Sequence, residues 1–242
     1  MSAFDTYLAL LRAYSRLDYP VWPLGAPVRV GDYGTFTKRA AAANRFMFER
    51  IGNLSEMLDE RLLATESFES DESLEDTRGA SFHMDAGAGA QAAGASARGS
   101  LTFSGEGSAL VQLEPRIITR AARLRDLMKA AQGLDVIASE GMVFIAEVSS
   151  ADRGVVALSD RSEWGLNLSG KAAALKLLNL ADASVSVEKQ QNDTILRRFK
   201  SRTPVMIRLY GRKNFFFGKV VLQMGAGEPQ IEPIFAQEHE NA

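Results

Sequence analysis

The sequence contains no cysteine and only 2 histidines among its 242 residues. Without cysteine the chain has no disulfide, no thiol nucleophile, no Cys-ligated zinc site and no S-acylation site, which is expected of a protein made in a reducing cytoplasm. The two histidines, His83 and His239, are far apart in the sequence and lack the spacing of metal ligands or of a catalytic triad. We therefore expect no histidine-based metal site and no histidine-based catalysis.

Long hydrophobic runs are missing as well. No segment is apolar over the length that a membrane-spanning helix requires, and the first residues lack the basic and apolar regions of a signal peptide. Ser2 stands where N-myristoylation would need glycine. The sequence predicts a protein that is made soluble and meets a membrane, if at all, through its own surfaces.

Charge is balanced in sum but uneven along the chain. The sequence has 28 Lys and Arg and 30 Asp and Glu. Acidic residues gather in residues 49–76 and after residue 227, whereas residues 194–227 contain no acid. The basic region 197–219 is interleaved with aromatic residues, a composition that suits binding of nucleic acid or another anion. Arginines on the solvent face of an edge strand would give the same composition, so nucleic acid is not the expected partner.

A ribbon of small residues, 81–114, dominates the middle of the chain. Even-numbered residues 82–90 and odd-numbered residues 101–113 are apolar or glycine, and nearly all of their neighbours are polar or glycine. Such alternation suits a β-strand with one apolar and one polar face, as in strands that cross a membrane. A solvent-covered hairpin or a flexible loop rich in alanine and glycine are the alternatives. Residues 155–187 form a second two-faced region, which predicts another long hairpin with a short helix at its tip.

The remaining pattern predicts an α+β fold. An amphipathic helix begins near Ser2 and ends before Tyr19, a second helix covers residues 116–132, and a short helix covers 56–63. Strands are expected at residues 28–36, 45–51, 141–148, 204–210 and 215–222, and a mobile loop in the acidic segment up to Arg78. A hydrophobic content of 46% is enough to bury a core.

Enzyme signatures are weak. Residues 87–92 nominally match a glycine-rich dinucleotide fingerprint, but no buried strand precedes them and no helix-forming sequence follows them. A P-loop is absent. We predict a protein that is not an enzyme and that needs no cofactor and no metal.

The order of these elements resembles the pore-forming domain of the gasdermins, and the short chain resembles the bacterial branch of that family. The resemblance covers residues 2–222. It lies in the amphipathic first helix, the strand and short helix of residues 45–58, the entry Phe82-His83 into the small-residue ribbon, helix 116–132, and strand 142–148. It implies a twisted, mainly antiparallel central sheet with surrounding helices and two extendable hairpins.

The resemblance also implies a mechanism. Residues 1–224 would be the pore-forming domain and residues 225–242 a short inhibitory tail. An activating protease would remove the tail from the latent cytoplasmic monomer. The freed chain would then oligomerise in the anionic inner (plasma) membrane as a β-barrel pore and cause cell death, as in antiviral (anti-phage) bacterial defence. Bacterial members often carry a lipidated N-terminal cysteine, which this chain lacks. The alternative is a non-enzymatic α+β module that binds an anionic ligand through the basic region.

The resemblance assigns roles to three groups of residues. Those expected to insert into the membrane are Phe82, Met84, Leu101, Phe103, Val111, Leu113, Trp164, Leu166, Leu168, Val185 and Val187. Lipid-contacting basic residues are expected at Arg12, Arg16, Lys38 and Arg39, and apolar anchors of the inhibitory tail at Ile231, Ile234 and Phe235.

Overall fold

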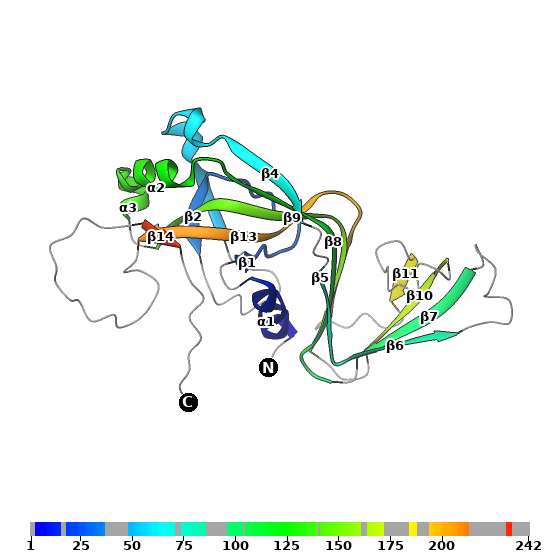
Figure 1. Cartoon of the computed structure of the whole chain (residues 1–242). Coiled ribbons are helices and arrows are strands. Elements are labelled where there is room, and N and C mark those ends of the chain that lie inside the picture. Colours follow the sequence, from blue (N-terminus) through cyan, green and yellow to red (C-terminus); the bar gives the residue numbers. More distant parts are fainter. Residues whose placement is uncertain are drawn as a thin grey trace. The chain divides into compact units, whose positions relative to one another are not determined.

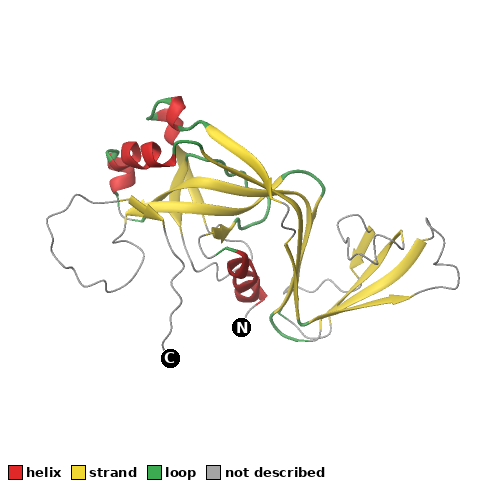
Figure 2. Ribbon diagram, in the orientation of Figure 1, coloured by secondary structure: helices red, strands yellow, loops and turns green. Residues whose placement is uncertain are grey.

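The structure is a computed structural model of the α+β class in which antiparallel strands predominate, as the sequence predicted (Figures 1 and 2). It describes residues 3–15, 18–36, 48–70, 74–85, 96–103, 105–139, 141–160, 164–171, 184–187, 194–212 and 231–233. The chain divides into two compact units. Unit 1 comprises Met1–Leu10, Asp71–Arg116 and Ala151–Thr203, and unit 2 comprises Leu11–Ser70, Ile117–Ser150 and Pro204–Ala242.

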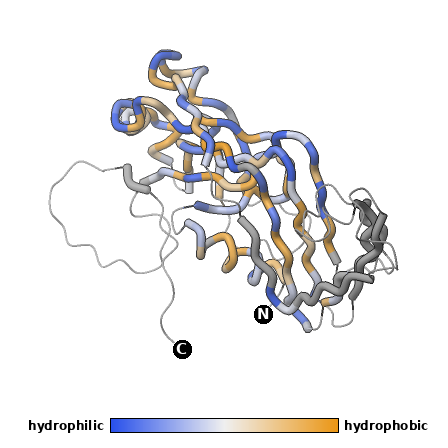
Figure 3. The backbone as a smooth tube through the Cα atoms, turned by 45° about the vertical axis from the view of Figure 1, so that its right-hand side comes forward, coloured by the Kyte–Doolittle hydropathy of each residue, from blue (hydrophilic) through white to orange (hydrophobic). Residues whose placement is uncertain are grey.

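Unit 2 is built on antiparallel strands that follow the order β1 (Asp18–Pro20), β13 (Thr203–Arg212), β9 (Met142–Ser159), β2 (Asp32–Phe36) and β3 (Phe48–Asn53). The short strand β14 (Ile231–Pro233) pairs with β13, and β4 (Thr65–Ser70) pairs with β8 (Ser108–Ala121). Strands β8 and β9 each extend into unit 1. Hydrophobic residues recur along these strands (Figure 3), and many of the buried hydrophobic residues belong to them.

The core of unit 2 lies where the strands meet α2 (Leu124–Gln132) and α3 (Asp135–Ala138). Leu127, Ala131 and Ile137 from the two helices are at most 1% exposed. They cluster with Phe144 and Tyr210, whose rings stack at 5.9 Å between centroids. Burial of a large apolar side chain of this kind contributes about 1.5–3 kcal/mol, so the packing of α2 is a main source of stability for this unit.

Gly34 lies at a β-bulge between β2 and β3, where the two backbones approach closely. A Cβ at this position would lie 1.9 Å from the backbone oxygen of Glu49. We expect Gly34→Ala to lower the free energy of unfolding by about 3 kcal/mol, because the opposing strand would have to move. Urea unfolding followed by circular dichroism measures this change.

Gly105→Ala is the matched control for Gly34→Ala. A Cβ at Gly105 would meet no atom within 4 Å. The same chemical change should therefore shift the unfolding midpoint very little. Equal destabilisation by both substitutions would show that the close approach at Gly34 is not what limits this position.

Helix α1 (Ala3–Tyr14) forms where the sequence predicted an amphipathic helix. Ala3, Tyr7, Leu10 and Leu11 are at most 2% exposed, and burial raises the pKa of the Tyr7 phenol well above its usual range. Tyr14, at the end of the helix, is exposed. None of the helices formed by the described residues combines the length and the apolar character needed to cross a bilayer.

The predicted helix over residues 116–132 is wrong in its first half. Strand β8 continues to Ala121, and α2 begins only at Leu124. Ile117, Ile118 and Thr119 are β-branched and favour the extended strand. Arg116 and Arg120 therefore lie in β8, and Arg123 directly precedes α2.

The acidic segment before Arg78 is also not a loop, because it contains β4 and β5 (Leu74–Arg78). Arg120 of β8 donates a hydrogen bond to Glu66, and its guanidinium lies 5.1 Å from the centroid of the Phe68 ring. The Ser67 and Thr119 hydroxyls are 2.8 Å apart. These contacts with β8 stabilise β4 as a strand despite its high charge.

The short helix predicted at residues 56–63 is instead two 3-10 turns, η1 (Leu54–Glu56) and η2 (Glu60–Leu62).

Candidate functional site

A separate four-stranded antiparallel sheet lies entirely within unit 1 and contains most of the residues expected to insert into a membrane. Its strand order is β11 (Ser184–Val187), β10 (Trp164–Lys171), β7 (Ser96–Phe103) and β6 (Ala80–Asp85). Strands β6 and β7 belong to the first predicted hairpin, and β10 and β11 to the second. The two hairpins join through the pairing of β7 with β10.

The register of this sheet brings all of its apolar positions to one face. Residues directly opposite in antiparallel strands share a face, and the faces alternate along each strand. One row across the four strands runs Phe82, Leu101, Leu166, Val187. The next row runs Met84, Gly99, Leu168, Val185. The complete face consists of Ala80, Phe82, Met84, Ala97, Gly99, Leu101, Phe103, Trp164, Leu166, Leu168, Gly170, Val185 and Val187. Every member is apolar or glycine.

The opposite face is polar except for Gly165. One of its rows runs His83, Ser100, Asn167, Ser186, and another pairs Asp85 with Arg98. Its members are Ser81, His83, Asp85, Ser96, Arg98, Ser100, Thr102, Gly165, Asn167, Ser169, Lys171, Ser184 and Ser186. Thr102 is exposed to solvent. The sheet therefore separates apolar from polar residues completely over all four strands.

The sequence predicted the alternation within each strand but not the rows across strands. Nine of the residues expected to insert lie on the apolar face, and the small residues Ala80, Ala97, Gly99 and Gly170 complete it. Val111 and Leu113 lie elsewhere, on β8, where they are fully buried. They pair with Asp76 and Leu74 of β5 in the larger sheet.

Each hairpin continues from the four-stranded sheet into the larger sheet. In the second hairpin, Thr194 of β12 (Thr194–Phe199) pairs with Ser159 of β9. If both arms are followed residue by residue from that pair, the same register places Ser169 opposite Ser184, and these two residues do pair. One register therefore holds over the whole described length of this hairpin.

The first hairpin changes register where it passes between the sheets. Arg78 pairs with Ala109 before the change, and Ala80 pairs with Phe103 after it. A single residue, Gly79, thus stands opposite the longer segment 104–108. Gly79 has φ 65° and Gly107 has φ 73°, a left-handed backbone that glycine adopts without strain. The extra residues lie on one arm of the hairpin only.

Polar contacts hold the hairpins within unit 1. The backbone nitrogen of Ala3, at the start of α1, donates a hydrogen bond to Oδ1 of Asp160 at the end of β9. A carboxylate at a helix N-terminus also interacts favourably with the helix dipole. Arg153 Nη2 lies 3.3 Å from Glu114 Oε2, which links β9 to β8. These contacts are partly exposed, so each contributes little to stability.

Only some of the other predicted residues fall within the described part of the chain. Arg12 lies in α1, and Ile231 lies in β14 opposite Arg212. Arg16, Lys38, Arg39, Ile234 and Phe235 lie outside the described residues, as do the glycine fingerprint 87–92, the strand predicted at 215–222 and the helix predicted at the tip of the second hairpin.

The basic region does not form one continuous surface over its described residues. Arg208 faces inward, with Nε 2.8 Å from Asp18 Oδ1 and Nη2 3.1 Å from Glu147 Oε1. Arg202 pairs with Asp152 at 3.0 Å. Sequence reasoning missed this internal role of Arg208, because partners so distant in sequence leave no local pattern. Within the described ranges, His, Asp and Glu side chains form no group of three or more that could hold a metal ion.

Comparison with known proteins gives a structural likeness but no match in sequence. No protein-family model and no curated protein matches the sequence. Among solved structures, a bacterial gasdermin from Bradyrhizobium tropiciagri matches with a TM-score of 0.36 and 14% identity, over 94% of this chain and 90% of that chain.

Proposed function

We propose that the chain is a latent pore-forming protein that assembles in anionic membranes as a β-barrel. The observation that carries the proposal is the complete separation of apolar and polar residues on the four-stranded sheet. A strand that separates lipid from an aqueous lumen needs this alternation. Strands β7 and β10 have 8 residues each, close to the roughly 9–11 that cross a hydrocarbon core.

The same sheet requires partners if it inserts. Strands β6 and β11 are its edges, and unpaired edge groups in hydrocarbon cost several kcal/mol each. Edge pairing between copies of the chain removes that cost by closing the sheet on itself. We therefore propose a homo-oligomer in the membrane and a monomer in the latent state.

Small residues on the apolar face support a latent state. Gly99, Gly170, Ala80 and Ala97 offer little surface for packing in the folded monomer. A sheet held by few apolar contacts opens at low free-energy cost. We propose that the tail, residues 225–242, restrains the pore-forming domain until a protease removes it, and that the resulting pore kills the cell in an anti-phage response. This part of the proposal draws on the element order that resembles the gasdermins.

Dye release from anionic liposomes tests the proposal. The full-length chain is compared with a chain that carries an engineered protease site near Gly225 and is cut during the assay. We expect release only after cutting, because removal of the tail frees the domain for assembly. Liposomes of neutral lipid serve as the control for the role of charge at the membrane.

Two results would contradict the proposal in different ways. Release by the uncut chain at the same rate would remove the inhibitory role of the tail but leave pore formation in place. No release after cutting, with circular dichroism showing that the cut chain is folded, would argue against pore formation itself. A non-enzymatic module that binds an anionic ligand would then be the better description.

A further inference from the structure

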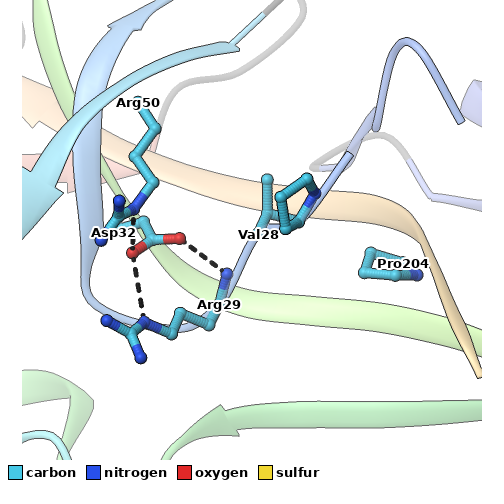
Figure 4. A pocket seen from close by; sticks show the side chains of 6 residues that line it. Val28, Arg29, Asp32, Arg50 and Pro204 are labelled. Atoms are coloured by element: carbon cyan, nitrogen blue, oxygen red, sulfur yellow. Dashed lines mark hydrogen bonds and ion pairs between the residues drawn. The ribbon is translucent and has the colours of Figure 1, made fainter. Parts of the chain in front are cut away.

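A surface cavity of about 350 Å³ in unit 2 combines two arginines with a buried carboxylate (Figure 4). It is lined by Pro27, Val28, Arg29, Asp32, Arg50 and Pro204. Asp32 is the first residue of β2 and Arg50 lies on the neighbouring strand β3, whereas Arg29 precedes β2. The fold therefore brings both guanidinium groups to the same carboxylate.

Asp32 is held as a fixed anchor. Its side chain is only 1% exposed, and its Oδ1 accepts hydrogen bonds from Arg50 Nε and Asn53 Nδ2, both at 2.8 Å. Its Oδ2 accepts a hydrogen bond from the backbone nitrogen of Arg29 at 2.9 Å. Arg29 Nε lies 3.5 Å from Oδ1. The hydrogen bond and the negative charge of Asp32 raise the pKa of Arg50.

Both arginines contact the Asp32 carboxylate through their Nε atoms. Among the described residues, no hydrogen bond or ion pair involves the terminal amino groups of Arg29 or Arg50. The Arg29 side chain is 69% exposed and that of Arg50 42% exposed. Each guanidinium thus keeps solvent-accessible donors beside the carboxylate that it contacts.

The local charge differs from that of the other ion pairs described in this chain. Arg120 and Arg202 each pair with one carboxylate, and Arg208 pairs with two. At Asp32 two guanidinium groups share one buried carboxylate. Glu56 also acts on Arg50 through its charge. Planar arginine donors match the oxygens of phosphate groups in pairs.

We propose that this cavity binds the phosphate group of a phosphate monoester. The terminal amino groups of Arg29 and Arg50 would donate hydrogen bonds to the phosphate oxygens, while Asp32 stays bound to their Nε groups. Pro27, Val28 and Pro204 form an apolar wall against which the alcohol part of the ester packs. The cavity volume is within the range of about 300–1,000 Å³ common for small-molecule sites. The site lies outside the four-stranded sheet and does not depend on pore formation.

Titration of the intact full-length chain with glycerol phosphate at constant ionic strength tests the proposal. The Nε–H signals of Arg29 and Arg50, followed by ¹H–¹⁵N NMR, are expected to shift in a saturable manner. Arg29→Gln should weaken binding about tenfold, since one charge-assisted contact of roughly 1.4 kcal/mol is lost. Because Asp32 retains its bonds from Arg50, Asn53 and the backbone of residue 29, this variant should keep its fold.

Arg120→Gln is the matched control, because Arg120 is an exposed arginine of the same unit that pairs with a single carboxylate. Its affinity for glycerol phosphate should equal that of the wild type. Absence of saturable shifts, or equal affinities for the wild type and Arg29→Gln, would overturn the proposal and leave the arginines with the role of neutralising Asp32.

An additional experiment with vesicles distinguishes a lipid headgroup from a soluble phosphate ester as the source of the phosphate monoester. The full-length chain is sedimented with phosphatidylcholine vesicles that contain or lack phosphatidic acid. Retention that needs phosphatidic acid and Arg29, and that glycerol phosphate competes away, identifies a lipid headgroup as the ligand. Saturable NMR shifts without such retention identify a soluble phosphate ester. Both results support the site, and neither requires dye release.

Discussion

Replacing Leu101 with lysine is expected to reduce dye release by the cut chain at least tenfold. Leu101 is on the apolar face, in a central strand, and stands between Phe82 and Leu166. A lysine on the lipid side of a membrane strand costs about 2–4 kcal/mol near the bilayer midplane. Each 1.4 kcal/mol is a factor of ten in an equilibrium constant, and every copy in an oligomer carries the same cost. Release kinetics from anionic liposomes measure the effect.

The adjacent substitution Thr102→Lys tests whether the loss of release depends on the face that carries the lysine or on added charge in general. Thr102 is exposed and occupies the polar face, between Ser81 and Gly165. A lysine there would face the aqueous lumen, so release should stay close to that of the unmodified cut chain. Both variants are first compared with the wild type by urea unfolding.

Equal loss of release in the two variants, with unchanged unfolding midpoints, would mean that the two faces do not play different roles. Loss in Thr102→Lys alone would reverse the assignment of the faces. Val111 is unsuitable for this test because it is fully buried on β8, and a charge there would destabilise the folded monomer directly.

Replacing Arg208 with alanine is expected to lower the free energy of unfolding by about 3–5 kcal/mol. Asp18 is 4% exposed and Glu147 is 8% exposed, and both accept hydrogen bonds from this one guanidinium. Burial by itself lowers the pKa of Arg208, but the charge and hydrogen bond of Asp18 and the charge of Glu147 raise it overall. Without the arginine two buried carboxylates lose their shared counter-charge, which is a strongly destabilising arrangement.

An exposed ion pair provides the control for Arg208→Ala. Arg202→Ala, which breaks an exposed pair with Asp152, should cost less than about 1 kcal/mol. A similar small loss of stability in both variants would show that Arg208 is not the counter-charge of a buried cluster.

The secondary-structure features that the sequence predicted correctly depend on residues that are close together in the chain. Helix α1 has an apolar stripe from Phe4 to Tyr14 and begins where the prediction placed it, although it ends at Tyr14 instead of just before Tyr19. Alternation along β7 and β10 follows from the period of a strand, so the face of each residue was predictable one strand at a time. The strand expected at residues 204–210 is present as β13.

Long-range pairing accounts for what the sequence could not predict. Ile117, Ala121, Leu124 and Met128 satisfy a helical period, yet the first two belong to β8, where the pairing of β4 with β8 stabilises the extended form. The residues that meet at Asp32 come from separate segments, and Arg208 and its two partners lie on three different strands. Such contacts depend on strand order, which no local pattern encodes.

The first hairpin has extra residues on one arm where its register changes, and the second hairpin has none over its described length. If the register of β6 and β7 continued through the bend, Leu74 would pair with Ala109 instead of Leu113. Both partners are odd-numbered, so the slide would leave every residue of β8 on its present face. In the proposed pore, the first hairpin would therefore lengthen at its bend without moving any residue of β8 to the other face. The second hairpin, already in one register, has no such change of register to remove.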